Sequence, residues 1–158
     1  CVRIVEREAD EAGIQIVRHS ASEDLPLALV DTDQMTQVFL NILINSIEAT
    51  PRGGSVSISA RTDDQGRLQI ITEDTGEGIP RENIDKLFDP FFSTKKKGTG
   101  LGLAIVKSII EGHGGEIEVE SDIGKGTRFT ITINTYQAPE IDENINGFGE
   151  LKSASGSV

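Results

Sequence analysis

The chain has 158 residues, of which 26 are acidic and 15 basic, and its formal net charge is −11. This charge argues against a general nucleic-acid or anionic-membrane surface, because the summed field repels polyanions. The single cysteine excludes an internal disulfide framework and a cysteine zinc site. No apolar run approaches the roughly 20 residues that cross a bilayer. We therefore expect one soluble globular domain from a reducing, cytoplasmic compartment, with no direct membrane contact of its own.

The start of the chain predicts a helix that enters from a missing upstream region. The first residue is Cys1 rather than methionine, which favours a fragment of a longer protein, either free or membrane-anchored. Apolar residues recur at helical spacing through residues 1–13, and Gly13 is a plausible stop. Residues 14–17 then alternate like a strand. His19 and His113 are too few and too far apart for a convincing metal cluster.

A long helix is predicted over residues 33–49, capped by Asp31 or Thr32. Its apolar residues form one stripe at the i, i+3, i+4, i+7 spacing. The members of this stripe are Met35, Val38, Phe39, Ile42, Leu43 and Ile47. Asn41 and Asn45 lie among polar residues on another side, one helical turn apart.

The remaining elements follow in chain order. They are a hairpin of residues 55–61 and 67–74, a short helix near Pro80, a loop over 89–100, a helix over 101–111, and strands over 116–120 and 127–135. Helices and hairpin strands mix without a βαβ repeat, which predicts one sheet with helices on one face. Residues 137–158 lack a sustained period and are rich in polar residues and glycine, which favours a flexible C-terminal tail.

The end of the predicted hairpin carries the motif Asp74-x-Gly76-x-Gly78. Asp74 shares an inward-looking strand face, and a buried carboxylate must find hydrogen-bond donors. An adenine ring offers an amino donor, and the two glycines let the backbone come close to a flat group. An acidic, glycine-rich surface turn is the alternative interpretation.

Glycines open the helix predicted over residues 101–111. Gly98, Gly100 and Gly102 expose backbone N–H groups at a helix start, where the helix dipole favours anions. Their spacing is neither the dinucleotide fingerprint nor a Walker loop. The run 95–97 just upstream consists of three lysines, the only run of positive charge in the chain. A solvated loop is the alternative to a phosphate site.

Asn41 and Asn45 are candidates for a magnesium site. Amide oxygens suit Mg²⁺, which takes few protein ligands when phosphate groups supply others. An ordinary hydrated helix face is the alternative.

Together these motifs resemble the catalytic, ATP-binding domain of bacterial sensor histidine kinases, over about residues 14–135. The matching segments, in order, are Asn41-Ile-Leu-Ile-Asn45, Asp74-x-Gly76-x-Gly78, Phe88-x-Pro-Phe-Phe-Ser-Thr-Lys95, Gly98-Thr-Gly-Leu-Gly-Leu103 and Gly124-Lys-Gly-Thr127. This domain belongs to the GHKL superfamily, with the Bergerat fold, shared with DNA gyrase, a heat-shock chaperone and MutL-type repair proteins. The Pro-Phe-Phe-Ser-Thr-Lys form is most similar to the nitrogen-sensor branch.

The resemblance implies a fold and a set of roles. The fold is α+β, a two-layer sandwich with a mixed, mostly antiparallel sheet and helices on one face, built from residues 14–136. Asn45 would bind Mg²⁺, Asp74 would accept from the adenine amino group, and residues 88–100 would form a mobile lid. Asn41 and Lys95 would be catalytic. The implied nucleotide-binding set is Asn41, Asn45, Asp74, Gly76, Gly78, Ile79, Phe88, Lys95, Thr99, Gly100, Leu101, Gly102, Leu103 and Thr127.

The sequence also departs from related proteins. The superfamily's ATP hydrolases carry a glutamate at the position of Asn41, and an amide cannot be a general base. Many kinases have a basic residue where this chain has Glu48, so one phosphate contact is missing or replaced by a lid lysine. The acceptor histidine of the family lies in an upstream helical hairpin. Neither His19 nor His113 has its neighbours, and we interpret His113 as structural.

The resemblance implies a kinase that passes the γ-phosphoryl group of ATP to that histidine and then to a response regulator. Its partners would be its own phosphoacceptor domain, the receiver domain of the regulator and, in a homodimer, a second copy. The alternatives are a stand-alone ATPase of the same fold, a serine-kinase or anti-sigma type regulator, and a degenerate binding module.

Overall fold

The computed structural model describes residues 2–19, 25–95 and 98–136. Its elements are α1 (Val2–Ala12), β1 (Gln15–Arg18), α2 (Thr32–Ala49), β2 (Ser55–Thr62), β3 (Leu68–Asp74), α3 (Arg81–Ile84), α4 (Gly102–Gly112), β4 (Glu116–Asp122) and β5 (Gly126–Ile133). Each predicted element is present, with ends displaced by no more than two residues. The tail predicted over 137–158 lies outside the described residues.

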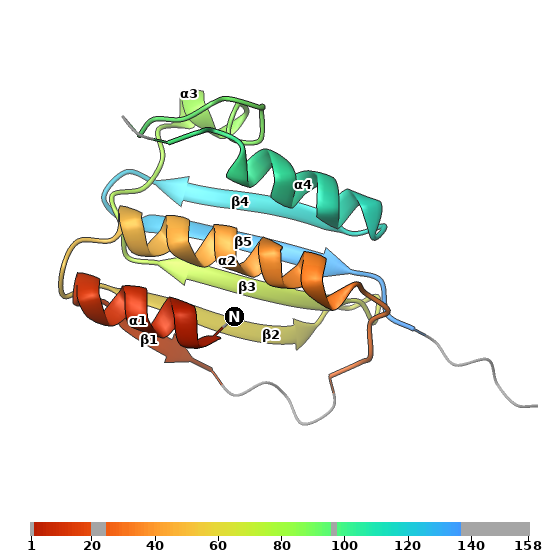
Figure 1. The fold of residues 1–158 in the computed structure, drawn as a ribbon. Coiled ribbons are helices and arrows are strands. Elements are labelled where there is room, and N and C mark those ends of the chain that lie inside the picture. Colours follow the sequence, from red (N-terminus) through yellow and green to blue (C-terminus); the bar gives the residue numbers. More distant parts are fainter. Residues whose placement is uncertain (1, 20–24, 96–97, 137–158) are drawn as a thin grey trace, which may run out of the picture.

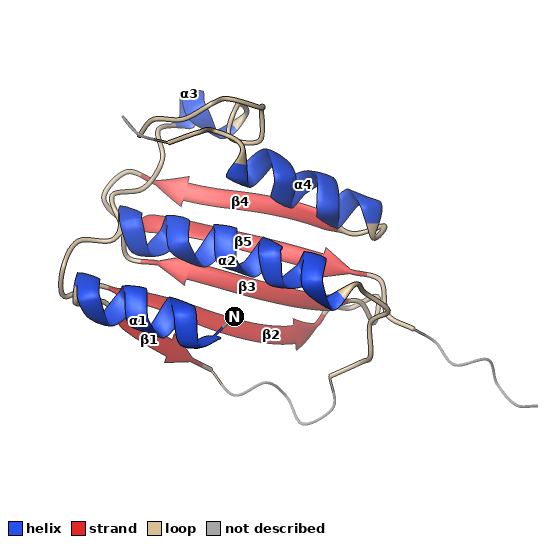
Figure 2. Cartoon of the chain, viewed as in Figure 1, coloured by secondary structure: helices blue, strands red, loops and turns tan. Residues whose placement is uncertain are grey.

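The five strands form one sheet in the order β1-β2-β3-β5-β4. Strands β1 and β2 are parallel and the other pairs are antiparallel, so the predicted mixed, mostly antiparallel sheet is confirmed. Helices α1, α2 and α4 lie side by side across one face of this sheet (Figure 1; Figure 2). The other face has no helix over it among the described residues. The result is the two-layer α+β sandwich that the resemblance implied.

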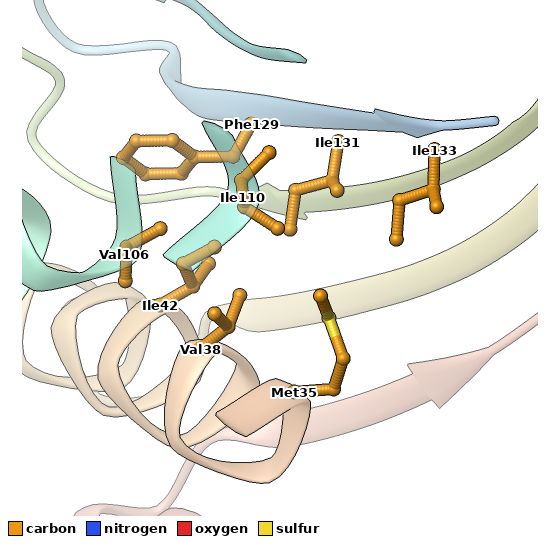
Figure 3. Close-up of a cluster of buried hydrophobic side chains, with 8 residues drawn as sticks. All are labelled: Met35, Val38, Ile42, Val106, Ile110, Phe129, Ile131 and Ile133. Atoms are coloured by element: carbon orange, nitrogen blue, oxygen red, sulfur yellow. The ribbon is translucent and has the colours of Figure 1, made fainter. Parts of the chain in front are cut away.

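Helix α2 lies at the centre of the helical layer because its apolar stripe packs in two directions. One core cluster joins α2 to α4 and β5 (Figure 3) and consists of Met35, Val38, Ile42, Val106, Ile110, Phe129, Ile131 and Ile133. A second cluster joins α2 to α1 and β2 and consists of Val5, Ala9, Ile14, Leu43, Ile47 and Val56. Phe39 packs against both clusters. Helix α1 therefore shares a core with the domain that follows it.

The start of α2 is held by polar contacts. The Asp31 carboxylate caps the helix and accepts hydrogen bonds from the backbone N–H groups of Asp33 and Gln34, both at 2.9 Å. His113, at the end of α4, contacts the same cap. Its Nε2 accepts from the Asp31 N–H at 3.1 Å, and its Nδ1 lies 2.8 Å from the carbonyl oxygen of Ile109. Both ring nitrogens of His113 thus contact the main chain, whereas His19 is exposed.

The sheet edge opposite β1 is protected by charge. Along β4, the glutamates Glu116, Glu118 and Glu120 alternate with partly buried Ile117 and Val119, which pack on the first core cluster. Acidic side chains on an edge strand oppose pairing with another chain. Within the described ranges, no helix has both the length and the apolar character to cross a membrane.

Two isoleucines of α4 differ in burial, so replacing each with alanine should cost different amounts of stability. Ile110 is fully buried in the first cluster, whereas Ile105 is 37% exposed. Replacing Ile110 with alanine should lower the free energy of unfolding by about 2–5 kcal/mol, through lost burial and the cavity left behind. The matched variant Ile105→Ala should cost less than about 1 kcal/mol. Urea denaturation measures both values, and equal losses would contradict the packing described.

Candidate nucleotide-binding site

A cavity of about 620 Å³ lies at the end of the sheet where α2 and β3 finish and α4 and β5 begin. This is the left end of the molecule in Figure 1. Most of the predicted nucleotide-binding residues line it: Asn41, Asn45, Asp74, Gly78, Ile79, Lys95, Thr99, Gly100, Gly102, Leu103 and Thr127. Four separate parts of the chain therefore converge on one cavity.

Three of the predicted residues do not line the cavity. Gly76 lies behind Asp74, against the end of α2. Phe88 is partly buried against the first core cluster, and the Lys107 ammonium lies 5.8 Å from the centre of its ring. Leu101 precedes α4 and is 36% exposed. Sequence spacing placed these residues near the motif but could not say which way each side chain points.

Asp74 ends β3 as a buried carboxylate, only 6% exposed. Its Oδ1 accepts hydrogen bonds from the backbone N–H of Gly76 at 2.9 Å and of Thr127 at 3.1 Å. Burial raises the pKa of Asp74 above its ordinary value, while the Gly76 N–H, the Ser46 hydroxyl and the Thr127 N–H oppose this shift. With Oδ1 engaged by the main chain, Oδ2 is the oxygen left for a ligand.

The glycines of the Asp74 motif are required by contacts within the protein. A Cβ atom at Gly76 would lie 2.6 Å from the carbonyl oxygen of Ala49. Gly78 has φ +72°, and its Cβ would lie 2.0 Å from the carbonyl oxygen of Asp122. In the structure, the backbones of α2 and β4 approach these glycines closely, and this packing by itself requires glycine at both positions. That the glycines also allow close approach to an adenine stays a prediction.

Two serines of the site were missed by sequence reasoning. Ser121 of β4 accepts from the Ile79 N–H at 2.8 Å, and its Oγ lies 2.9 Å from the hydroxyl of Thr127. It therefore holds the segment after Gly78 next to Thr127. Ser46 of α2 is 2% exposed and lines the cavity. Its hydroxyl is close enough to the Asp74 carboxylate to lower the pKa of that group, but no described residue lies at ordinary hydrogen-bond distance from its Oγ. A polar residue within the apolar stripe of α2 was the signal for Ser46; Ser121 had none.

Helix α2 also contributes the polar residues at the other end of the cavity. The side chain of Asn41 lies next to Gly102, whose Cβ would be 3.5 Å from Asn41 Oδ1. The ammonium of Lys95 donates to Asn45 Oδ1 at 3.0 Å and also pairs with Glu48. Within the described part of the chain, no three His, Cys, Asp or Glu side chains form a metal cluster. Any cation held here would take few protein oxygens and would depend on ligand atoms for the rest.

The loop before α4 turns tightly and leaves the helix start open. Phe91 donates its N–H to the carbonyl oxygen of Gly100 at 2.9 Å, and both residues have positive φ angles, 67° and 66°. Phe91 is 77% exposed, while the next residue, Phe92, lines the cavity. Among the residues that the structure describes, no side chain caps α4 at its first turn. Its leading N–H groups therefore remain available to an anion.

The comparisons with known proteins agree with this geometry. The family model described as "Histidine kinase-, DNA gyrase B-, and HSP90-like ATPase" matches residues 30–137. The chain belongs to this family. The assignment to a nitrogen-sensor branch within it stays a prediction.

Curated relatives and solved structures give the extent of the likeness. The sensor histidine kinase ZraS of Salmonella typhimurium is 43% identical over 82% of this chain and 28% of its own length. Sporulation kinase E of Bacillus subtilis is 43% identical over 77% of this chain and 16% of its own length. The catalytic domain of histidine kinase ThkA matches with a TM-score of 0.72 at 33% identity, over 85% of this chain and 90% of that domain. Full-length ShkA in complex with AMPPNP matches with a TM-score of 0.75 at 32% identity, over 87% of this chain and 29% of its own. The chain thus spans less than a third of ZraS and of sporulation kinase E.

In the turn beside Asp74, replacing each of two glycines with alanine should cost different amounts of stability. Gly126 has φ +101°, and its Cβ would lie 1.8 Å from the carbonyl oxygen of Asp74; Gly124 has φ +77°, with no atom within 4 Å of its Cβ. Gly124→Ala should lower the free energy of unfolding by about 1–2 kcal/mol through backbone strain. Gly126→Ala should cost about 2–5 kcal/mol, because a clash adds to the strain. Thermal and urea unfolding test this, and equal costs would show that the turn is looser than described.

Proposed function

We propose that this domain binds Mg-ATP and donates the γ-phosphoryl group to a histidine on a separate helical-hairpin domain of the same kinase. A response regulator would then receive the group. The observation that carries the proposal is one cavity lined both by a buried carboxylate, Asp74, and by the amide pair Asn41 and Asn45. The likeness to sensor histidine kinases over most of the chain supports it.

The chemistry of the Asp74 end fits an adenine. Asp74 Oδ2 would accept a hydrogen bond from the adenine amino group, since Oδ1 is engaged by backbone donors. The buried Ser46 hydroxyl lies near Asp74 but has no described residue at ordinary hydrogen-bond distance, so it can bond to a ligand or an ordered water. Thr127 would assist with its hydroxyl, and Ile79 and Leu103 add apolar contacts along the cavity.

The chemistry of the α4 end fits phosphate groups and a magnesium ion. Gly100, Gly102 and Thr99 line the cavity at the start of α4, where N–H groups and the helix dipole favour an anion. Asn45 Oδ1 already accepts from a cationic group, and an amide oxygen is a suitable Mg²⁺ ligand. When bound, Mg²⁺ would neutralise phosphate charge during transfer.

Transfer to a partner is favoured over hydrolysis. The side chain of Asn41 is an amide and cannot deprotonate water. In this proposal Asn41 and Lys95 position and neutralise the phosphates, which is most of what phosphoryl transfer requires. The second candidate, ATP hydrolysis by the domain alone, would use Glu48 to activate water, but Glu48 is paired with Lys95.

The partners proposed for the full-length protein are its own phosphoacceptor hairpin, a second copy in a homodimer and a receiver domain. Apolar side chains that suit contact with a helical hairpin lie beside the cavity: Phe91, Leu101 and Ile105 are all exposed. Phe91 is hydrogen-bonded to Gly100, and Ile105 is one helical turn after Leu101. The net charge of −11 disfavours DNA or RNA as a binding partner.

The adenine contact is tested by Asp74→Asn. An asparagine can keep the oxygen that accepts from Gly76 and Thr127, but its NH₂ would then face the adenine amino group. Affinity for ATP and ADP should fall by at least about 1–3 kcal/mol while the fold is kept. Glu77→Gln is the matched control, since Glu77 also lines the cavity but is exposed. Calorimetry that gives equal affinities for wild type and Asp74→Asn would refute the contact.

Because the pKa of Asp74 is raised, both the stability of the fold and the affinity for adenine nucleotides should depend on pH. The folded state holds the Asp74 proton more tightly than the unfolded chain, because burial disfavours the charged carboxylate. The stabilising contribution of protonated Asp74 is therefore complete below the ordinary pKa and is lost as pH rises through the raised value. Adenine binding needs the charged form, so the affinity ratio of wild type to Asp74→Asn should fall on acidification. The midpoint should lie above the ordinary aspartate pKa.

The transfer step is tested with γ-labelled ATP. The 158-residue chain alone should neither label itself nor release phosphate at an appreciable rate, because a positioned general base typically contributes about 10²–10⁴-fold and Asn41 cannot act as one. Adding a helical hairpin that bears an acceptor histidine should yield acid-labile label on the hairpin. Label on the isolated chain would instead implicate His19 or His113.

A further inference from the structure

One surface of α2 presents two oxygen atoms to a single positive charge. The Lys95 ammonium donates to Asn45 Oδ1 at 3.0 Å and to an Oε2 oxygen of Glu48. Asn45 and Glu48 are three residues apart on a helix, a spacing that brings side chains together on one face. An amide oxygen and a carboxylate oxygen therefore converge on one point that a cation occupies.

This cation is held in a way that favours its exchange. The side chains of Lys95 and Glu48 are 41% and 54% exposed. Ion pairs with such exposure contribute little to stability, since water competes for both partners. Lys95 is also carried by the loop before α4 and not by a helix or strand. Its ammonium can leave the two oxygens without disturbing the core.

The position of Glu48 creates an electrostatic problem that a cation would solve. Glu48 lines the cavity close to the residues proposed to bind phosphate. A carboxylate beside a polyphosphate is repelled unless positive charge lies between them. Many kinases that this sequence resembles carry a basic residue at this position, and the acidic side chain of Glu48 reverses the local charge.

We propose that Glu48 binds the divalent cation of the nucleotide complex together with Asn45, and that the Lys95 ammonium occupies this cation position in the absence of the ion. The inference rests on the proposed function, because nucleotide phosphates supply the remaining ligands. Mg²⁺ prefers oxygen donors, keeps several waters and commonly uses one or two protein carboxylates beside substrate phosphates. Glu48 thus determines how strongly this domain depends on Mg²⁺.

The competing explanation is that Glu48 acts only through Lys95, by holding that lysine over the cavity. The two explanations differ in whether Glu48 matters once Lys95 is gone. A double-mutant comparison separates them, since removal of Lys95 abolishes the ion pair but leaves a cation site intact.

The experiment measures ADP binding to the full chain by calorimetry over a series of Mg²⁺ concentrations. The readout is the Mg²⁺ concentration that gives half of the affinity gain. Glu48→Gln should raise this midpoint by about 10-fold or more, the range found when groups that support a metal are removed. The same rise should occur in a Lys95→Met background. Thermal melting of each variant verifies that the fold is kept.

Glu111→Gln is the matched control. Glu111 forms an exposed pair with Lys107 on α4, at a comparable exposure of 60% and 48%, but lines no part of the cavity. Its Mg²⁺ midpoint should equal that of the wild type. A shift in this control would show that losing any negative charge changes the midpoint, which would overturn the inference.

Two further outcomes would overturn it. A midpoint unchanged in Glu48→Gln excludes a role in cation binding while leaving the nucleotide site of the proposed function intact. A shift that vanishes in the Lys95→Met background assigns Glu48 to the ion pair alone. Failure of the wild type to bind ADP at any Mg²⁺ concentration would instead remove the proposed function, and with it this inference.

Discussion

The packing of α2 between two halves of the core is the constraint on which the rest of the structure depends. Its apolar stripe joins β5 and α4 on one side and α1 and β2 on the other. Ile42 and Val38 are fully buried at this junction. Burial of this stripe on both sides fixes the rotation of α2 about its own axis, and this rotation sets the direction of its polar face. Asn41 and Asn45 therefore face the cavity as a consequence of core packing.

At the proposed adenine end of the cavity, a carboxylate is buried at a cost in stability. The buried Asp74 carboxylate is unfavourable by itself, which is why its pKa is raised. Two backbone N–H groups offset part of the cost at Oδ1. They reach it because glycines at 76 and 126 let neighbouring backbones approach within distances that a side chain would forbid. The buried carboxylate thus lowers stability but provides a hydrogen-bond acceptor for the proposed nucleotide base.

The proposed phosphate end of the cavity is built from exposed groups and not from buried ones. These groups are the start of α4, which no described side chain caps, the glycine-rich loop before it, and the Lys95 ammonium, which this loop holds against Asn45 of α2. Such contacts add little to stability and can be exchanged for ligand contacts. On this proposal the site has a rigid base-recognition end built into the core and an adaptable phosphate end built on a loop, which suits a domain that binds ATP and releases ADP.

The sequence by itself determined the order and type of the elements, because the period of apolar residues reports which face of a helix or strand is buried. It also determined the family, because Asn41, Asn45, Asp74 and the glycines before α4 occur together at their characteristic spacing. Only the tertiary structure decided how the side chains are used. Ser46 and Ser121 joined the site and Phe88 turned to the core, since contacts between distant segments carry no local pattern. The pairing of Lys95 with Glu48 across 47 residues was likewise decided by folding, which brought a loop and a helix face together.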